Sequence, residues 1–468
     1  MKRMDAARPL FAFFSFFLLM SSTTFGQEEN SCMKDAATYC KEIAPGGGRV
    51  IRCLMNHFNE LTPECRDFLL RLASAQDKGT PKTPSVSPGD EKQAPVPQEY
   101  LKIYSALEKT LNDYDTRLNS LSNGKKYPVV FGAELLPANC NRGKALLQPQ
   151  AIQGVILYLD RLKELGVQGV TIPIHYPLYT PNFPGYDGYV AYYKEVAREV
   201  RKRDMKLDVE SHVIFANTSF SDLSLSYTGL TFEKFKAEKR QMVAAIIRDV
   251  QPDYLNLGAE PDTEAVLTGL KEFSDPKKYT DYLNDILDGL SRGSTKIIAG
   301  IGTWGNLEYV RSFAKNTSVD AIGIHVYPVI GKGLDNTLAI ADIARQYGKS
   351  LVLDEAWLYK SDRYIGHDNT AWSELFRRDV FSFWAPLDRQ FLAAMVKFAR
   401  TQGVEYVSPF WTGCFFAYVD YDKSNSNLPY KELSAIQNQS AASNLLKGKF
   451  TSTGEFYKTL IQINTNSK

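Results

Sequence analysis

The sequence predicts an α/β fold, a (β/α)8 TIM barrel, preceded by a small helical hairpin module that disulfides hold together. Eight short apolar segments follow one another after residue 99, and amphipathic helical patterns separate most of them. This alternation is typical of a parallel sheet covered on both faces, and eight strands are the number that closes a barrel. An open doubly wound sheet is less favoured, because no glycine-rich phosphate loop follows the first segment.

The eight strands are expected where the apolar segments lie. These segments span residues 127–136, 169–176, 207–215, 254–260, 296–303, 321–328, 351–356 and 406–412. Patterns such as "PQAIQGVILYLDRLKELG" place helices between them. Barrel enzymes carry their functional residues at the C-terminal ends of the strands, so we expect the site there.

Residues 1–26 are predicted to be a secretory signal peptide. They combine a basic start, an apolar stretch over Pro9–Met20 and a small, polar end. The apolar stretch is too short for a membrane anchor, so we expect a secreted or periplasmic protein with no membrane span after cleavage. The net charge of +2 falls to zero without this segment, which disfavours nucleic acid and anionic lipid as partners.

Residues 27–72 form a predicted cysteine-rich module, with Cys32, Cys40, Cys53 and Cys65 in two helical patterns. The run "PGGGRV" and the ending "LTPEC" resemble a cysteine-rich repeat of the Golgi-apparatus-protein type. Antiparallel helices would pair Cys32 with Cys65 and Cys40 with Cys53. The module's residues indicate no particular partner. A linker rich in Pro, Ser and Thr is expected at 73–98, and the barrel at 99–468.

The predicted strand ends carry polar or aromatic residues. They include two glutamates, Glu260 on the fourth strand and Glu355 on the seventh, which face each other across a barrel mouth. Glycoside cleavage needs two carboxylates flanking the anomeric carbon. The other candidates, expected to bind substrate, are His175, Tyr176, Glu210, His212, His325, Tyr327 and Trp411.

These residues resemble the motifs of clan-A glycoside hydrolases, retaining barrel enzymes that include endo-β-1,4-galactanases, cellulases and mannanases. The resemblance spans about residues 125–420 and rests on "GAEPD", "HVY", "LDEAW" and "SPFWTG". It implies that Glu260 is the acid/base and Glu355 the nucleophile. It also implies that Tyr327, beside His325, hydrogen-bonds the nucleophile and that Trp411 forms the floor of a sugar subsite.

One residue departs from the clan's pattern. Ala259 stands where the clan has an asparagine that binds the sugar 2-hydroxyl, and His212 and Glu210 are the candidates to replace it. Ala259 therefore supports an alternative, a barrel that binds glycans without cleaving them. A second alternative is a metal-dependent hydrolase using His175, Glu210, His212, Glu260 and His325. It is less favoured, because the first strand lacks the His-x-His common in such barrels. We expect a carbohydrate substrate and neither metal nor cofactor.

Two further cysteines test barrel closure. Cys140 follows the first predicted strand and Cys414 the eighth, and closure makes these strands neighbours. Both cysteines would then lie in adjacent loops, close enough for a disulfide in an oxidising compartment. We therefore predict a Cys140–Cys414 bond.

Overall fold

The computed structural model describes residues 26–41, 53–54, 57, 60–66, 94–121, 124–218, 221–364 and 369–465. The chain divides into two compact units, residues 1–91 and 92–468. The predicted signal peptide and most of the predicted linker lie outside the described residues. Among the described helices, none has the length and apolar character needed to cross a bilayer.

In the first unit, helix α1 (Gly26–Tyr39) carries the first cysteine. The predicted disulfides are confirmed, with Cα separations of 4.7 Å for Cys32–Cys65 and 5.9 Å for Cys40–Cys53. Buried Asp35 accepts hydrogen bonds from the backbone N–H and the hydroxyl of Thr62, at 2.8 and 2.9 Å. These cross-links stabilise a unit whose buried apolar cluster is small.

The second unit is the predicted barrel. Its parallel strands are β1 (Val130–Phe131), β2 (Gly169–Pro173), β3 (Lys206–Glu210), β4 (Tyr254–Asn256), β5 (Lys296–Gly302), β6 (Ala321–Val326), β7 (Ser350–Ala356) and β8 (Val404–Pro409). Neighbours along the sheet run from β2 through β8 to β1, and β1 pairs with β8. A bridge between Glu134 and Thr171 joins the two ends, so the sheet closes as predicted.

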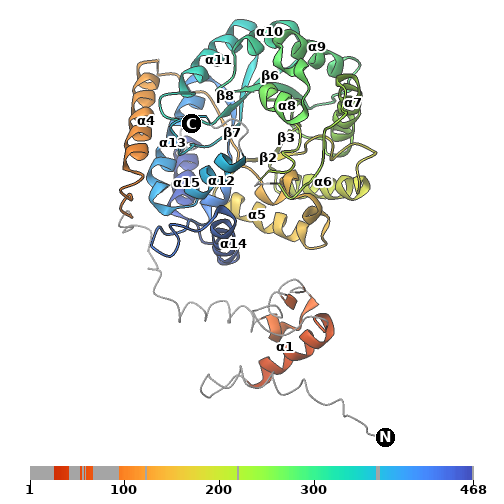
Figure 1. Ribbon diagram of the computed structural model, residues 1–468, viewed down its shortest axis with the longest axis vertical. Helices are drawn as coiled ribbons and strands as arrows, with labels where there is room; N and C mark the ends of the chain where they lie inside the picture. The colour runs from red at the N-terminus through yellow and green to blue at the C-terminus, as the bar shows by residue number, and fades with distance from the viewer. Residues whose placement is uncertain are drawn as a thin grey trace. The chain divides into compact units, whose positions relative to one another are not determined.

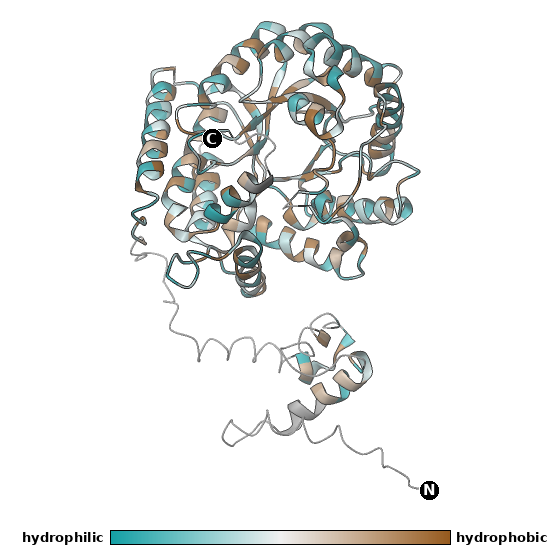
Figure 2. Cartoon of the chain, viewed as in Figure 1, coloured by the Kyte–Doolittle hydropathy of each residue, from teal (hydrophilic) through white to brown (hydrophobic). Residues whose placement is uncertain are grey.

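Helices surround the strands (Figure 1). They are α4 (Leu101–Leu121), α5 (Ala151–Glu164), α6 (Tyr186–Arg201), α7 (Phe232–Asp249), α8 (Pro261–Thr268), α9 (Pro276–Leu287), α10 (Glu308–Asn316), α11 (Leu334–Tyr347), α12 (Asn369–Asp379), α13 (Ala385–Gln402), α14 (Tyr430–Lys447) and α15 (Ser452–Thr465). Short 3-10 turns include η3 (Leu136–Ala138), η4 (Cys140–Leu147), η5 (Lys271–Ser274), η6 (Ser382–Trp384) and η7 (Thr412–Phe415). Figure 2 shows that the helices carry both apolar and polar residues while the strands are largely apolar. This pattern fits amphipathic helices packed on a buried sheet.

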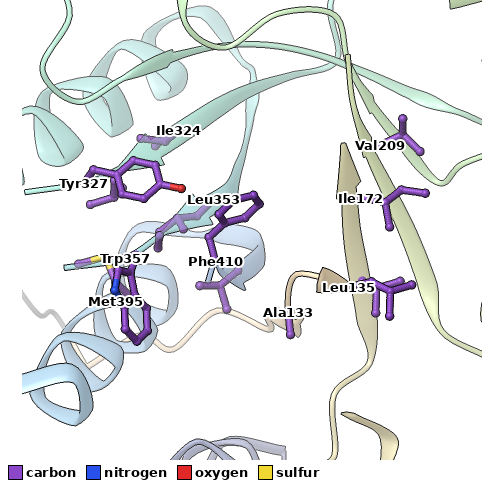
Figure 3. Packing of buried hydrophobic residues seen from close by; sticks show 14 of the residues in the cluster. Ala133, Leu135, Ile172, Val209, Ile324, Tyr327, Leu353, Trp357, Met395 and Phe410 are labelled. Carbon is purple, nitrogen blue, oxygen red and sulfur yellow. The ribbon is translucent and has the colours of Figure 1, made fainter. Parts of the chain in front are cut away.

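The apolar core fills the space between strands and helices, as Figure 3 shows for Trp357 beside Met395 of α13. A second, smaller cluster lies near the N-terminal ends of five strands and comprises Tyr254, Ile298, Ala321, Val352 and Tyr406. The hydroxyl of Tyr406 lies 3.2 Å from that of Thr171 on β2. This cluster is therefore a packed floor beneath the polar residues at the other end of the barrel.

The predicted Cys140–Cys414 disulfide is wrong, because both residues are free, buried thiols. Barrel closure is correct, but the two thiols have different neighbours. Cys140 lies against the backbone of His175 beyond β2, where burial raises the pKa of its thiol. Cys414 faces Tyr418 and Asp388 of α13 instead. Adjacent strands therefore do not bring these two side chains together.

Gly323 on β6 makes room for a polar contact at the barrel centre. A Cβ at this position would lie 2.7 Å from both Asn256 Nδ2 and Asp354 Oδ2, which are hydrogen-bonded to each other. Both side chains are fully buried and cannot swing away into solvent. We therefore expect Gly323→Ala to lower the free energy of unfolding by about 1–3 kcal/mol, as overpacking does.

The matched control is Gly154→Ala on the exposed face of α5, where an added Cβ meets nothing within 4 Å. Alanine favours the helix, so this variant should gain about 0.5–1 kcal/mol. Chemical denaturation of both variants measures the two changes. A Gly323→Ala variant with the same free energy of unfolding as the wild type would show that Gly323 is not tightly packed.

Candidate active site

A pocket opens at the C-terminal ends of the strands. Seven of the nine residues predicted from the sequence line it: His175, His212, Glu260, His325, Tyr327, Glu355 and Trp411. They come from segments that end β2, β3, β4, β6, β7 and β8, so barrel closure brings them together. Pro261 begins α8 directly after Glu260, which fixes the direction in which the chain leaves β4.

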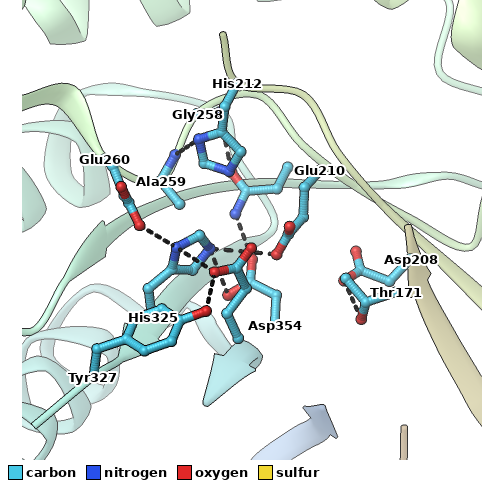
Figure 4. A network of polar contacts seen from close by, with 12 residues as sticks. Thr171, Asp208, Glu210, His212, Gly258, Ala259, Glu260, His325, Tyr327 and Asp354 are labelled. Carbon is cyan, nitrogen blue, oxygen red and sulfur yellow. Dashed lines mark hydrogen bonds and ion pairs between the residues drawn. The ribbon is translucent and has the colours of Figure 1, made fainter. Parts of the chain in front are cut away.

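His325 lies at the centre of the site and contacts four carboxylates (Figure 4). Its Nδ1 is 2.8 Å from Glu260 Oε1 and 3.4 Å from Glu355 Oε2. On the other side of the ring, Nε2 is 3.3 Å from Glu210 Oε1 and 3.8 Å from Asp354 Oδ1. One imidazole therefore links carboxylates from three different strand ends, those of β3, β4 and β7.

These contacts limit the distance between the two predicted catalytic glutamates. Glu260 Oε1 and Glu355 Oε2 lie 2.8 and 3.4 Å from the same nitrogen, so they are separated by at most the sum, about 6.2 Å. Retaining glycosidases hold their carboxyl groups about 5–5.5 Å apart, and inverting ones about 6.5–9.5 Å. The bound is compatible with the retaining spacing.

The side chain of Glu355 is fixed by its neighbours. The hydroxyl of Tyr327 donates a 2.5 Å hydrogen bond to Glu355 Oε2, the contact that the resemblance implied. On the floor side, Asn256 donates to Asp354, and Asn256 Oδ1 accepts from the backbone N–H of Gly258 at 3.1 Å. The strand ends of β4 and β7 are thus tied together beneath the pocket.

The charge states of this cluster follow from burial and proximity. Burial alone would lower the pKa of His325, but Glu355, Glu260 and Asp354 outweigh it and raise the pKa to about 10. One imidazolium cannot balance all of these carboxylates. The pKa of Glu355 is accordingly raised, by burial first and then by the nearby charge of Glu210.

The other two histidines of the pocket are neutral. Burial lowers the pKa of both His175 and His212, and the positive charge of His325 lowers each further. Nδ1 of His212 accepts a 3.3 Å hydrogen bond from the backbone N–H of Ala259. Behind them, Lys239 of α7 donates to the backbone carbonyls of Ser211 and His212 and holds the segment after β3.

Two predicted residues do not line the pocket. Tyr176 was expected to bind substrate, but its side chain packs on Phe235 and its hydroxyl donates to Glu238 Oε2 at 2.5 Å. Successive side chains of an extended segment point to opposite sides, so His175 faces the pocket and Tyr176 faces α7. Glu210 is fully buried beneath the pocket and contacts residues that line it, including His325 at 3.3 Å.

Several pocket residues were not predicted. Asp262, Thr263 and Glu264 belong to α8, and Tyr359, Tyr364, Trp372 and Phe376 come from the loop after β7 and from α12. Trp304 also lines the pocket, and its indole N–H donates to Asp262 Oδ2 at 2.8 Å. For the residues of α8 the sequence held a signal, because Asp262 and Glu264 follow Glu260 in the first turn of a helix.

Among the residues that the structure describes, three overlapping buried sets could hold a metal ion, each with ligand atoms within 4.8 Å of one another. They are His175–Glu210–His212, Glu210–His325–Glu355 and Asp208–Glu210–Asp354. Glu210 is common to all three.

Comparisons with known proteins give matches to both units. Residues 29–62 match the family model described as a cysteine rich repeat, which confirms the predicted module. A GH5_18 variant from Bifidobacterium longum subsp. longum, in complex with Manb1-4GlcNAc, is similar at 15% identity and a TM-score of 0.48, covering 72% of this chain and 79% of that chain.

Two further solved structures are similar to this chain. An exo-beta-1,4-mannosidase from Opitutaceae bacterium strain TAV5 has 17% identity and a TM-score of 0.44, covering 74% of this chain and 62% of that one. A GH5 xyloglucan-specific endo-beta-1,4-glucanase from a metagenomic library has 13% identity and a TM-score of 0.40, covering 74% and 98%. The comparison with curated proteins found no match.

The charge of His325 is open to direct measurement. Its raised pKa means that it stays protonated well above the usual value of about 6.5, whereas His175 and His212 stay neutral. At pH 8, NMR of protein labelled at the histidine ring carbons should show one buried imidazolium and two neutral rings. His325→Gln assigns the charged signal by removing it.

The same shift sets a stability trend. Because the folded-state pKa is raised, the contribution of His325 is fully present below pH 6.5 and is lost as the pH rises through about 10. Three neutral rings at pH 8 would contradict the charge that we assign to the centre of the site.

Proposed function

We propose that this protein is a retaining glycoside hydrolase that cleaves β-linked poly- or oligosaccharides by double displacement. The observation that carries the proposal is the pair Glu260 and Glu355, which extend from opposite sides of the barrel to the same nitrogen of His325. Their oxygens are close enough for one sugar carbon to lie between the nucleophile and the acid.

In this proposal, Glu355 attacks the anomeric carbon and Glu260 protonates the leaving oxygen. A glycosyl ester on Glu355 results, and Glu260 then removes a proton from the water that hydrolyses it. Tyr327 aims the attacking oxygen through its 2.5 Å hydrogen bond. His325 is a positioning residue: it holds both carboxyl groups in place, and its positive charge favours the ionised form of the nucleophile Glu355.

The pocket walls suit a sugar ring. Trp304, Trp411 and Trp372 line the pocket with Tyr359, and aromatic faces pack well on the apolar faces of sugars. His175 and His212 offer ring nitrogens for hydroxyl groups on the opposite side. Trp411 has a positive φ of 54°, a backbone conformation that is rare outside glycine, and it turns the chain into the pocket wall directly after β8.

The disulfides of the first unit support export to an oxidising compartment, in which an extracellular or periplasmic glycan is the substrate. A second candidate function is glycan binding without cleavage. Ala259 favours it, because its methyl group cannot donate a hydrogen bond to the sugar beside the acid/base.

The two glutamates make the decisive prediction. On a panel of β-1,4-linked mannan, xylan, glucan and galactan, Glu260→Gln should lower kcat/KM by about 10²–10⁴-fold, the usual worth of a general acid/base. Glu355→Gln should lose at least as much activity, because it cannot form the covalent intermediate. The control Glu308→Gln changes an exposed carboxylate on α10 and should keep full activity.

A 2-deoxy-2-fluoro-β-glycoside with a good leaving group separates the two roles. It should label the wild-type chain once, on the peptide that holds Glu355, as read by mass spectrometry. Sugar binding by the wild type with neither turnover nor labelling would establish the glycan-binding alternative instead.

A further inference from the structure

Three side chains at the ends of β2 and β3 form a cluster with the donor set of a metal site. His175 follows β2, Glu210 ends β3, and His212 lies two residues further. Each offers one ligand atom within 4.8 Å of the others, and each is at most 4% exposed. Adjacent strands of the closed barrel hold all three in one place, so the cluster is built by the fold.

Several polar atoms of this cluster lack hydrogen bonds. Within the described part of the chain, no partner in hydrogen-bond geometry lies at Nε2 of His212 or at either ring nitrogen of His175. The carboxyl group of Glu210 interacts with that of Glu355. Nε2 of His325 lies 3.3 Å from Glu210 Oε1. Buried polar groups without partners are costly, so a ligand that satisfies several of them at once would be stabilising.

The surrounding charge favours a cation. Asp208, Glu210 and Asp354 are fully buried, and Glu355 is 8% exposed. In the described structure these four carboxyl groups outnumber the cationic side chains beside the cluster, His325 and Lys239. His175 and His212 each offer one ring nitrogen to this cluster, and imidazole nitrogens are common metal ligands.

The two competing sets are less suitable. Glu210–His325–Glu355 uses a histidine that already holds Glu260 at 2.8 Å through Nδ1. In Asp208–Glu210–Asp354, the first carboxylate accepts from Thr171 and the last from Asn256. By contrast, His175 and His212 both line the pocket, which gives an ion a path of entry.

We infer that His175, Glu210 and His212 bind a divalent transition-metal ion of the zinc class, with an open coordination position facing the pocket. Two imidazoles and one carboxylate are the ligand set of many zinc sites that keep a fourth position free. Zinc bonds of about 2.1 Å place ligand atoms at most about 4.2 Å apart, so the side chains must close by up to about 0.6 Å.

Ion binding has a structural consequence at His212. An ion on Nε2 requires the ring proton to be on Nδ1, where the backbone N–H of Ala259 now donates at 3.3 Å. That long contact must open when the metal binds. The three ligands include neither Glu260 nor Glu355, so the inference does not depend on the two proposed catalytic carboxyl groups. A bound ion would take the ring nitrogens that the proposed function offers to sugar hydroxyl groups.

Titration of the full, tag-free chain tests the site. After chelator treatment, ZnCl2 added in a calorimeter should bind at one ion per chain, and CoCl2 should produce a visible absorption band of low-symmetry coordination. His175→Ala and His212→Ala should each weaken zinc binding by at least about 100-fold, since even outer partners of metal ligands are worth 10–100-fold. The control His57→Ala, in the first unit, should bind as the wild type does.

X-ray absorption at the zinc edge of the loaded wild type gives a readout that needs no variant. It should show two imidazoles per ion, and the Glu355→Gln chain should give the same spectrum whether or not the wild type cleaves glycans. Binding of less than about a tenth of an ion, unchanged affinity in both folded histidine variants, or a spectrum without imidazole would each overturn the inference.

Discussion

The site depends on one buried cation, the imidazolium of His325. Carboxylates from β3, β7 and the segment after β4 converge on its two nitrogens, and such groups would repel one another without it. The proton on His325 therefore does more than pair with one glutamate. It allows Glu260 and Glu355 to lie close together across the barrel mouth, which is the arrangement that the proposed chemistry uses.

The barrel supplies the rigidity that this charge cluster needs. Beneath the pocket, Asn256 joins Asp354, and Gly323 leaves the space for that contact. Lower still, Tyr406 and its apolar neighbours form a buried cluster inside the barrel. Burial strengthens each electrostatic contact, because the local dielectric constant is low. The packed cluster beneath the pocket keeps the charged atoms from moving apart.

The strands, and the position of Glu260 and Glu355 at the barrel mouth, could be predicted because each depends on local pattern. Apolar runs locate the strands, and a glutamate that ends such a run must lie at the barrel mouth. This reasoning fails for Tyr176. Successive side chains of an extended segment point to opposite sides, so Tyr176 contacts α7 and does not line the pocket. The predicted Cys140–Cys414 disulfide was wrong because strand pairing does not fix the direction of the loop that follows each strand. Trp372 and Phe376 were missed because a helix far along the chain brings them to the pocket.

Three histidines lie in a row at the mouth, and their different charges follow from their neighbours. The ring centroids of His175 and His212 are 5.2 Å apart, and those of His212 and His325 are also 5.2 Å apart. His325 contacts the carboxylates directly and gains a proton. His212 lies next to that positive charge, and burial already disfavours a proton on its ring, so it stays neutral. The proton on His325 thus gives the pocket two different sides. Glu260 and Glu355 lie on the charged side, and the neutral rings of His175 and His212 on the other side can offer lone pairs to a ligand.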